Sequence, residues 1–361
     1  MLHYLTGFTA LFLLSVSALR ATPLEIIPPE LRGALQPQVA IAPNGRVDIT
    51  FGKGTAIYHV ASTNGGRSFS PPTTVANLPK LALGMRRGPR ISATDSTLVI
   101  SAISPDEGSL RAWVSTDEGR TWAQPVQIND VPNSAREGLH AMAGDGKGFV
   151  IAMWLDLRNG GMELWSSTSS DGGTSWGANI RVYASPDGNI CECCHPSVAV
   201  SSKGEIAVMW RNWLAGSRDM YLAMSRDGGR TFSAAQKLGE GTWKLNGCPM
   251  DGGAVAFDHA GQPLTTWRRE KSLFRTHGGS LETLLAERGL QPLAFADGSG
   301  AAFAWQDEHG LRLLRASGEA KMLGAGGSFP AAAAGADGKT AIVVWEAPAG
   351  GSRTIMAEAL D

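Results

Sequence analysis

The octapeptide Ser115-Thr-Asp-Glu-Gly-Arg-Thr-Trp122 decides the fold, because versions of it occur four times along the chain. The other three are Ser62-Thr-Asn-Gly-Gly-Arg-Ser-Phe69, Ser169-Ser-Asp-Gly-Gly-Thr-Ser-Trp176 and Ser225-Arg-Asp-Gly-Gly-Arg-Thr-Phe232. Their third positions, Asn64, Asp117, Asp171 and Asp227, are 53, 54 and 56 residues apart. Such near-constant spacing indicates a fold built from repeated supersecondary units.

Each residue type in the octapeptide has a role in a tight turn. The Asp or Asn side chain is expected to accept hydrogen bonds from backbone N–H groups two residues on, as in an Asx turn. The glycine supplies a backbone conformation with positive φ. The Ser and Thr hydroxyls bond within the turn, and the Trp or Phe packs over it.

A second repeat extends over the whole chain and consists of a short apolar strand, a turn, and a second strand that ends in a large residue. Seven copies are found, at 37–51, 89–103, 140–154, 196–210, 253–267, 292–305 and 330–345. Segments such as Phe149–Trp154 and Ala341–Trp345 are short, apolar and bounded by turns, which is typical of buried strands.

The octapeptide matches the Asp box, Ser-x-Asp-x-Gly-x-Thr-Trp, and the chain resembles the sialidase-like Asp-box (BNR) β-propellers. In that family the boxes lie on the turns between strands 3 and 4, away from the active face. With seven repeats, we predict an all-β propeller of seven blades, each a four-stranded antiparallel sheet. A six-bladed ring, as in sialidases proper, is the alternative. The chain ends after a third strand, so Thr22–Ile27 is expected to supply the last blade's missing strand.

Composition and the N-terminus restrict the class of protein. With 32 Lys and Arg against 33 Asp and Glu, the chain is near neutral, and nothing in its composition suggests a nucleic-acid partner. Residues 1–21 contain an apolar stretch followed by small residues, which predicts a signal peptide. We therefore expect residues 22–361 to form a single-domain monomer that is periplasmic or secreted and has no stable membrane insertion after cleavage.

Propeller topology places the starts of strand 1 and the ends of strand 2 on one face, around the central axis. The residues expected there include all four cysteines of the chain: Arg86, Arg87, Arg90, His140, Asp156, Arg158, Asn159, Cys191, Cys193, Cys194, His195, Arg211, Asn212, Cys248, Met250, Asp251, Arg268, Arg269 and Glu270. Loops on such a face of a rigid scaffold are common places for function.

Three interpretations compete for the cysteines. The first is structural, because an exported protein permits two disulfides. Cys191, Cys193 and Cys194 are too close in sequence to pair easily with one another, so one bridge of the Cys191–Cys248 type with two leftover thiols is the more natural disulfide arrangement. The second is a soft-metal site, for copper first and zinc second, formed by Cys191, Cys193, Cys194, His195 and Cys248 with His140 and Met250. The third is thiol–disulfide chemistry among neighbouring cysteines.

The resemblance also implies an exo-α-sialidase, which needs three arginines for the substrate carboxylate, a tyrosine nucleophile assisted by a glutamate, and an aspartate acid. Arg90, Arg158, Arg211 and Arg268 are candidates for the carboxylate site, and Asp106, Asp156 and Glu270 are candidates for the acid. In that family the tyrosine comes from a late blade, yet no tyrosine follows Tyr221.

We therefore expect a non-hydrolytic propeller that binds a soft metal ion or carries out thiol chemistry at its axial mouth, while Arg90, Arg158 and Arg211 bind an anionic partner or steady the rim. A glycan-directed hydrolase or glycan-binding propeller is the alternative, and a propeller with purely structural cysteines is the third possibility.

Overall fold

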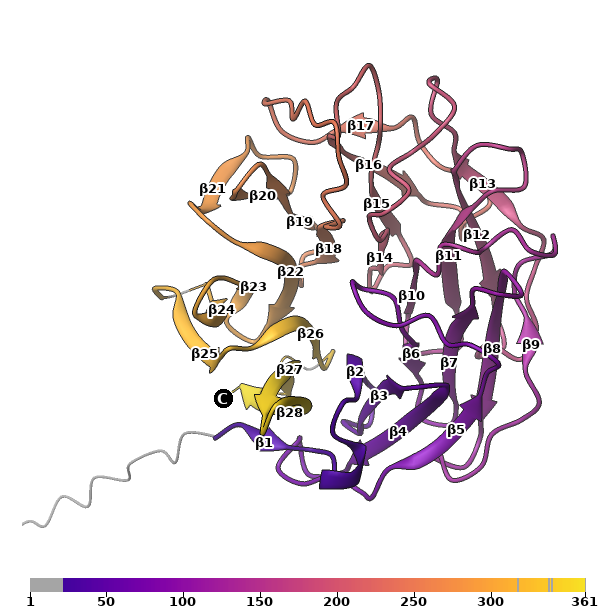
Figure 1. The fold of residues 1–361 in the computed structure, drawn as a ribbon, viewed down its shortest axis with the longest axis vertical. Helices are drawn as coiled ribbons and strands as arrows, with labels where there is room; N and C mark the ends of the chain where they lie inside the picture. Colours follow the sequence, from indigo (N-terminus) through magenta and orange to yellow (C-terminus); the bar gives the residue numbers. More distant parts are fainter. Residues whose placement is uncertain (1–21, 317, 337, 339, 361) are drawn as a thin grey trace, which may run out of the picture.

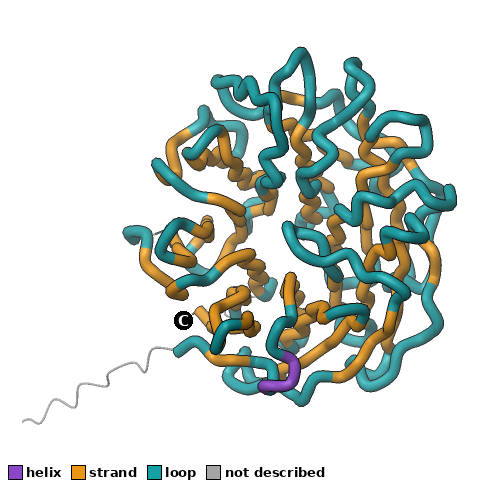
Figure 2. Tube along the Cα trace, viewed as in Figure 1, coloured by secondary structure: helices purple, strands orange, loops and turns teal. Residues whose placement is uncertain are grey.

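Seven four-stranded antiparallel sheets surround a central axis in the computed structural model, which describes residues 22–316, 318–336, 338 and 340–360 (Figure 1). Strands and loops account for nearly all of it, and the exception is one 3-10 turn, η1 (Pro29–Leu31) (Figure 2). The prediction of a seven-bladed propeller is confirmed, and the six-bladed alternative is wrong. The predicted signal peptide lies outside the described residues.

The first four blades follow one another along the chain. Blade 1 is formed by β2 (Leu35–Ile41), β3 (Val47–Lys53), β4 (Ala56–Ser62) and β5 (Thr73–Asn77). Blade 2 is formed by β6 (Arg90–Ala93), β7 (Leu98–Ser104), β8 (Ser109–Ser115) and β9 (Val126–Gln127). Blade 3 is formed by β10 (His140–Gly144), β11 (Val150–Asp156), β12 (Glu163–Ser169) and β13 (Ile180–Tyr183). Blade 4 is formed by β14 (Ser197–Val200), β15 (Ile206–Arg211), β16 (Met220–Ser225) and β17 (Gln236–Lys237).

The last three blades lack Asp boxes but keep the same order of strands. Blade 5 is formed by β18 (Ala254–Phe257), β19 (Pro263–Arg269), β20 (Ser272–His277) and β21 (Thr283–Ala286). Blade 6 is formed by β22 (Leu290–Asp297), β23 (Gly300–Gln306), β24 (Gly310–Leu314) and β25 (Lys321–Ala325). Blade 7 is formed by β26 (Ser328–Ala334), β27 (Ala341–Ala349) and β28 (Ser352–Leu360), with β1 (Leu24–Glu25) as its outer strand.

The ring is closed by pairing the two ends of the described chain. Leu24 lies opposite Ala357 and Glu25 opposite Met356, and the Thr354 hydroxyl donates a 2.6 Å hydrogen bond to Glu25. In Figure 1 the indigo β1 lies beside the yellow β28. The expectation that the N-terminal segment completes the last blade is confirmed.

The hydrophobic core lies between neighbouring blades. Second strands such as β11 are buried along their whole length, and one core cluster joins Met153 and Leu155 of β11 to Val208 and Trp210 of β15. Trp154, Trp210 and Trp345 are among the largest fully buried side chains. Removing each such side chain from water contributes roughly 1.5–3 kcal/mol or more, so face-to-face packing of blades supplies the main stabilisation.

The Asp boxes lie at the turns between strands 3 and 4 of the first four blades, as the resemblance implies. In the second box Asp117 accepts hydrogen bonds from the backbone N–H of Thr121 (2.9 Å) and from its hydroxyl (2.6 Å). The expectation that Asp117 accepts from an N–H two residues on is wrong, because the donor is four residues on. Glu118 and Gly119 both have positive φ (62° and 83°), which lengthens the turn. No helix among the described residues is long and apolar enough to cross a membrane.

Candidate thiol site on the loop face

The two cysteine segments meet on the loop face, which carries the loops between strands 2 and 3 and those between blades. Cys191, Cys193 and Cys194 lie in the loop from β13 to β14, and Cys248 lies in the loop from β17 to β18. Gly252 allows the two loops to touch, because a Cβ there would lie 1.7 Å from the carbonyl oxygen of His195. The expectation that consecutive blades bring the cysteines to one face is confirmed.

One disulfide joins the loops, between Cys193 and Cys248, whereas Cys191 and Cys194 are free thiols. The number of bridges matches the one-bridge expectation, but its member from the first loop is Cys193 and not Cys191. The backbone explains the difference: Cys191 N–H donates to the Arg211 carbonyl at 3.0 Å, and Ile190 pairs with Asn212. Cys191 is thereby held alongside the end of β15.

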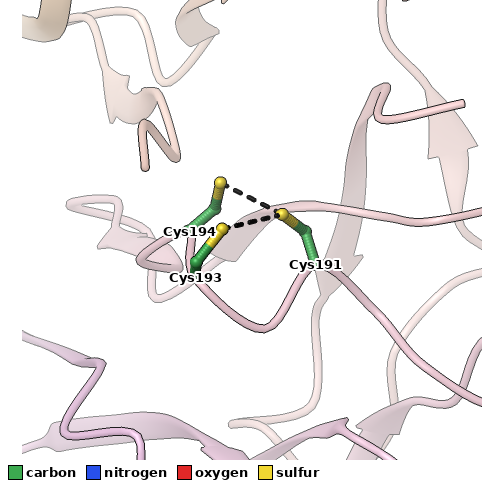
Figure 3. A group of neighbouring side chains, drawn as sticks. All are labelled: Cys191, Cys193 and Cys194. Atoms are coloured by element: carbon green, nitrogen blue, oxygen red, sulfur yellow. Dashed lines mark hydrogen bonds between the residues drawn. The ribbon is translucent and has the colours of Figure 1, made fainter. Parts of the chain in front are cut away.

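The free thiols form a close, buried pair (Figure 3). The Sγ atoms of Cys191 and Cys194 are 3.2 Å apart, and the Sγ of Cys193 lies 3.8 Å from that of Cys191. The side chains of Cys191 and Cys194 are 1% and 2% exposed. Met250 packs against the same cluster. Cys191, Cys193 and Cys194 form a group of three residues of a type that can bind a metal ion. Their sulfur atoms all lie within 4.8 Å of one another.

Arg218 makes the two thiols electrostatically different. Its Nη1 lies 3.1 Å from the Sγ of Cys191, while its Nε donates to the Leu245 carbonyl at 3.4 Å. The hydrogen bond with Cys194 and, more weakly, the positive charge of Arg218 outweigh burial and lower the pKa of Cys191 to about 6. Burial, followed by the neighbouring Cys191, raises the pKa of Cys194. The pair therefore holds one negative charge and one proton near neutral pH.

Neither predicted histidine gathers with the free thiols. The Nε2 of His195 contacts the Gly253 carbonyl at 3.0 Å, and its Nδ1 accepts the Gly252 N–H at 3.3 Å, so both ring nitrogens are occupied. The Nε2 of His140 contacts the Ser101 hydroxyl at 3.0 Å. Burial, followed by nearby arginines, lowers the pKa of both rings, which keeps them neutral.

Two of the candidate arginines hold the loops of this face together. Arg211 is 1% exposed and donates to the carbonyls of Asp251 (2.9 Å), Arg218 (2.6 Å) and Arg268 (2.9 Å). Arg268 donates to the Pro249 carbonyl at 2.9 Å and lies 3.6 Å from the Asp251 carboxylate. These contacts occupy three of the five N–H donors of Arg211 and one of Arg268, whose Nε has no hydrogen-bond partner among the described residues.

The other two candidate arginines, Arg90 and Arg158, also have hydrogen-bond partners of their own. Arg90 folds back onto the carbonyls of Gly88 and Pro89, each at 3.0 Å, and also donates to the Arg86 carbonyl. Arg158 pairs with the buried Asp156 at 2.9 Å and with Asp130 at 2.7 Å, and stacks on Trp165.

Two of the three candidate acids, Asp156 and Glu270, have different surroundings. Asp156 is fully buried and accepts hydrogen bonds from the indole N–H of Trp154 (2.6 Å) and the Ser134 hydroxyl (2.7 Å). Glu270 is exposed in the turn after β19, with a φ of 57°.

Sequence reasoning did not select Arg218, whose positive charge adds to the hydrogen bond with Cys194 in lowering the pKa of Cys191. It lies in the loop between β15 and β16, 27 residues after Cys191 in the chain, and the Ser217–Lys244 bridge holds this loop against the Cys248 loop. The only signal for Arg218 in the sequence was its place in the loop between strands 2 and 3 of blade 4. The three-cysteine loop leads into the first strand of the same blade. That position is shared by many loop arginines.

The comparisons with known proteins agree with this architecture. Residues 92–244 match the family model described as BNR repeat-like domain. An α-L-arabinanase from Penicillium chrysogenum superposes with a TM-score of 0.57 at 15% identity, over 94% of this chain and 98% of that one. A virginiamycin B lyase from Staphylococcus aureus gives 0.55 at 10% identity, over 94% and 99%. An intramolecular trans-sialidase from Ruminococcus gnavus gives 0.51 at 11% identity, over 76% and 90%. No curated protein sequence matches the chain.

Fold and repeats together define an Asp-box propeller of seven blades. The match over residues 92–244 and the structural similarities support the resemblance to BNR-repeat, sialidase-like β-propellers that the octapeptides predicted. At identities of 10–15%, the structural similarities establish the fold alone.

Proposed function

We propose that this propeller binds a soft metal ion, copper(I) before zinc, through the thiols of Cys191 and Cys194. One observation carries the proposal: two sulfur atoms lie 3.2 Å apart in a buried site beside a guanidinium that stabilises a thiolate. A thiolate is the form of cysteine that ligates metals, and soft sulfur ligands select copper(I) or zinc.

Burial favours an ion over a larger reaction partner. With both thiols at most 2% exposed, the disulfide of another protein could not reach either sulfur without opening of the loops. A bare ion needs a far smaller opening. Metal–sulfur bonds of about 2.3 Å require the sulfurs to separate to roughly 4 Å, which side-chain rotation can supply.

Reduction of the Cys193–Cys248 disulfide would free a third cysteine sulfur beside the thiol pair. Cys193 lies 3.8 Å from Cys191, and its partner Cys248 is exposed. An external thiolate that attacks Cys248 Sγ forms a mixed disulfide there and releases Cys193 as a thiolate. A second external thiol then releases Cys248 and leaves as a disulfide, so two electrons enter the site. The reduced protein would present three adjacent cysteine sulfurs, with Met250 beside them.

Thiol counting and elemental analysis of protein purified without added metal test this proposal. We expect two free thiols and near-stoichiometric copper or zinc in the wild type. Cys191→Ser and Cys194→Ser should each lower copper(I) affinity at least tenfold in competition with a colorimetric chelator. The Cys193→Ser/Cys248→Ser double variant keeps the thiol pair and is the matched control. Metal-free protein with unchanged weak copper(I) binding in all four proteins would refute the proposal.

A glycan-directed activity is the second candidate, and the comparisons favour it over metal binding. The arabinanase and the trans-sialidase are by name glycan-active proteins, and they superpose on 94% and 76% of this chain. The local geometry gives it less support, because Arg211 and Arg268 are engaged by backbone carbonyls and Asp156 by Arg158. Release of a fluorophore from sialosides and α-L-arabinofuranosides tests it. Turnover that Cys191→Ser leaves intact would establish this function in place of the thiol site.

A further inference from the structure

Cys191 lies between a disulfide and a second free thiol. Its Sγ is 3.8 Å from that of Cys193, which is one half of the Cys193–Cys248 bridge, and 3.2 Å from that of Cys194. Figure 3 shows both contacts converging on the sulfur of Cys191. Thiol–disulfide exchange begins when a thiolate attacks one sulfur of a disulfide. Cys191 is therefore placed to attack the bridge at Cys193.

The surroundings of Cys191 suit a nucleophile. The Nη1 of Arg218 lies 3.1 Å from its Sγ and favours the negative charge that attack requires. Its backbone N–H is bonded to the Arg211 carbonyl at the end of β15, and its carbonyl accepts the N–H of Cys194 at 3.5 Å. These bonds hold Cys191 and Cys194 in one tight turn. Their C-x-x-C spacing is that of redox-active dithiols.

The two sulfur pairs differ in their access to solvent. Cys191 and Cys194 are both buried, whereas Cys248 is exposed. A thiol or disulfide outside the protein can therefore react at Cys248 but does not reach the buried pair. Exchange between the two pairs would carry electrons from the buried sulfurs to a sulfur that external molecules contact.

We propose that the four cysteines form a two-electron relay: the buried dithiol reduces the disulfide, and the released Cys248 thiol reduces small disulfides outside the protein. In the first step the Cys191 thiolate bonds to the Sγ of Cys193, and Cys248 leaves with the electron pair of the broken bond. In the second step Cys194 loses its proton and bonds to the Sγ of Cys191, and Cys193 leaves as a thiolate. The proton from Cys194 passes to Cys248. The buried pair is thereby oxidised by two electrons and the exposed pair is reduced by two.

The two bridges that form along this route differ in strain. A bridge between Cys191 and Cys193 spans a single intervening residue, so it closes a small strained ring and is readily opened by the second step. The bridge between Cys191 and Cys194 is the product, and the fold already holds these two sulfurs 3.2 Å apart. Strain and position therefore both favour completion of the exchange.

An external disulfide completes the reaction. The Cys248 thiolate attacks it, forms a mixed disulfide and releases one external thiolate. Cys193 then attacks the Cys248 sulfur, releases the second external thiolate and restores the original bridge. This function goes beyond metal binding and does not depend on it. A metal ion on Cys191 would occupy the attacking sulfur, so the two activities exclude one another at any one time.

A bulky maleimide, added with a metal chelator and without reductant or oxygen, tests the internal exchange. It should label Cys248 of the wild type, because exchange releases this exposed sulfur. Denaturation, iodoacetamide alkylation and peptide mapping should then show iodoacetamide on Cys193 and a disulfide between Cys191 and Cys194. Two thiols are free before and after exchange, so the positions of the labels decide. An intact Cys193–Cys248 bridge, or maleimide on Cys191 or Cys194, overturns the proposal.

Two variants separate the steps. Cys191→Ser lacks the attacking sulfur and should lose the labelling of Cys248, and labelling at the wild-type rate overturns the proposal. Cys194→Ser keeps only the first step, so it should carry maleimide on Cys248 while Cys193 is bonded to Cys191. If Cys191→Ser fails to fold by circular dichroism, Cys194→Ser still decides, because an intact Cys193–Cys248 bridge in it overturns the proposal. The chelator removes metal, so failure of the relay leaves metal binding untouched.

Excess oxidised glutathione, added in place of the maleimide, tests the step with an external disulfide. The wild type should lose both of its free thiols and release the same number of glutathione thiols. Peptide mapping should show the original Cys193–Cys248 bridge together with a new one between Cys191 and Cys194. Retention of both protein thiols overturns the proposal.

Discussion

Replacing Cys194 by alanine should raise the pKa of Cys191 and deprive the site of its thiolate near neutral pH. The Cys194 sulfur lies 3.2 Å from that of Cys191, and its hydrogen bond is the largest of the effects that lower the pKa of Cys191 from 9.0 to about 6. The charge of Arg218, at 3.1 Å, is the next largest. The double change Cys194→Ala/Arg218→Gln should therefore raise the pKa further than the single one.

The size of the effect follows from the pKa. At pH 7 a thiol with a pKa of about 6 is about 90% thiolate, whereas one at 9.0 is about 1% thiolate. The lowered pKa of Cys191 means that the thiolate form stabilises the folded state, relative to the unfolded chain, by at most about 4 kcal/mol. Solvent screening of the half-buried Arg218 reduces this value. Since the folded pKa is the lower one, this stabilisation is complete above pH 9.0, declines as the pH falls, and is absent below about pH 6.

Ultraviolet thiolate absorbance, followed against pH without oxygen or reductant, measures the titration directly and requires no reagent to enter the buried site. The wild type should gain one thiolate near pH 6, and Cys194→Ala should gain it at higher pH. Cys191→Ala leaves only Cys194 free, whose raised pKa should delay its titration until above pH 9.0. A Cys191→Ala protein that titrates near pH 6 would refute this assignment of the charge.

Three further changes test the scaffold around the site. The Cys193→Ser/Cys248→Ser double variant opens a loop of 55 residues and should lower the free energy of unfolding by about 4 kcal/mol in urea without reductant; an unchanged value would show that the bridge contributes nothing. Arg211→Met should cost more than about 3 kcal/mol in thermal unfolding, because three carbonyls lose their donor, whereas Arg181→Met on the surface should cost little. Hydrogen bonds from Thr231 lower the pKa of Asp227 to about 2. The stabilisation of the folded state by the Asp227 carboxylate is therefore present above pH 3.8 and is lost as the pH falls through about 2. Asp227→Asn, which copies Asn64, should weaken the acid sensitivity measured by circular dichroism in that window.

Much of the site could be predicted from topology, and the rest could not. The repeat placed all four cysteines on one face, because strand order alone decides which loops share a face. The pairing of Cys193 with Cys248 follows from the hydrogen bond of Cys191 to Arg211, which is a contact between a loop and the end of β15. The histidines were assigned to the site by their repeat positions, yet their rings bond to Gly253 and Ser101 instead.

The sequence by itself determined the architecture: four Asp boxes, seven strand pairs and an N-terminal strand that closes the ring. These features are local and repeated, so hydrogen bonding within each turn and apolar packing between neighbouring strands express them without reference to distant residues. The tertiary structure alone decided which cysteines pair, which thiol carries charge, and which arginines are already engaged. These properties depend on distances of about 3 Å within the three-cysteine loop and from it to the end of β15 and to the loop of Arg218. Electrostatic and sulfur interactions change steeply over such distances.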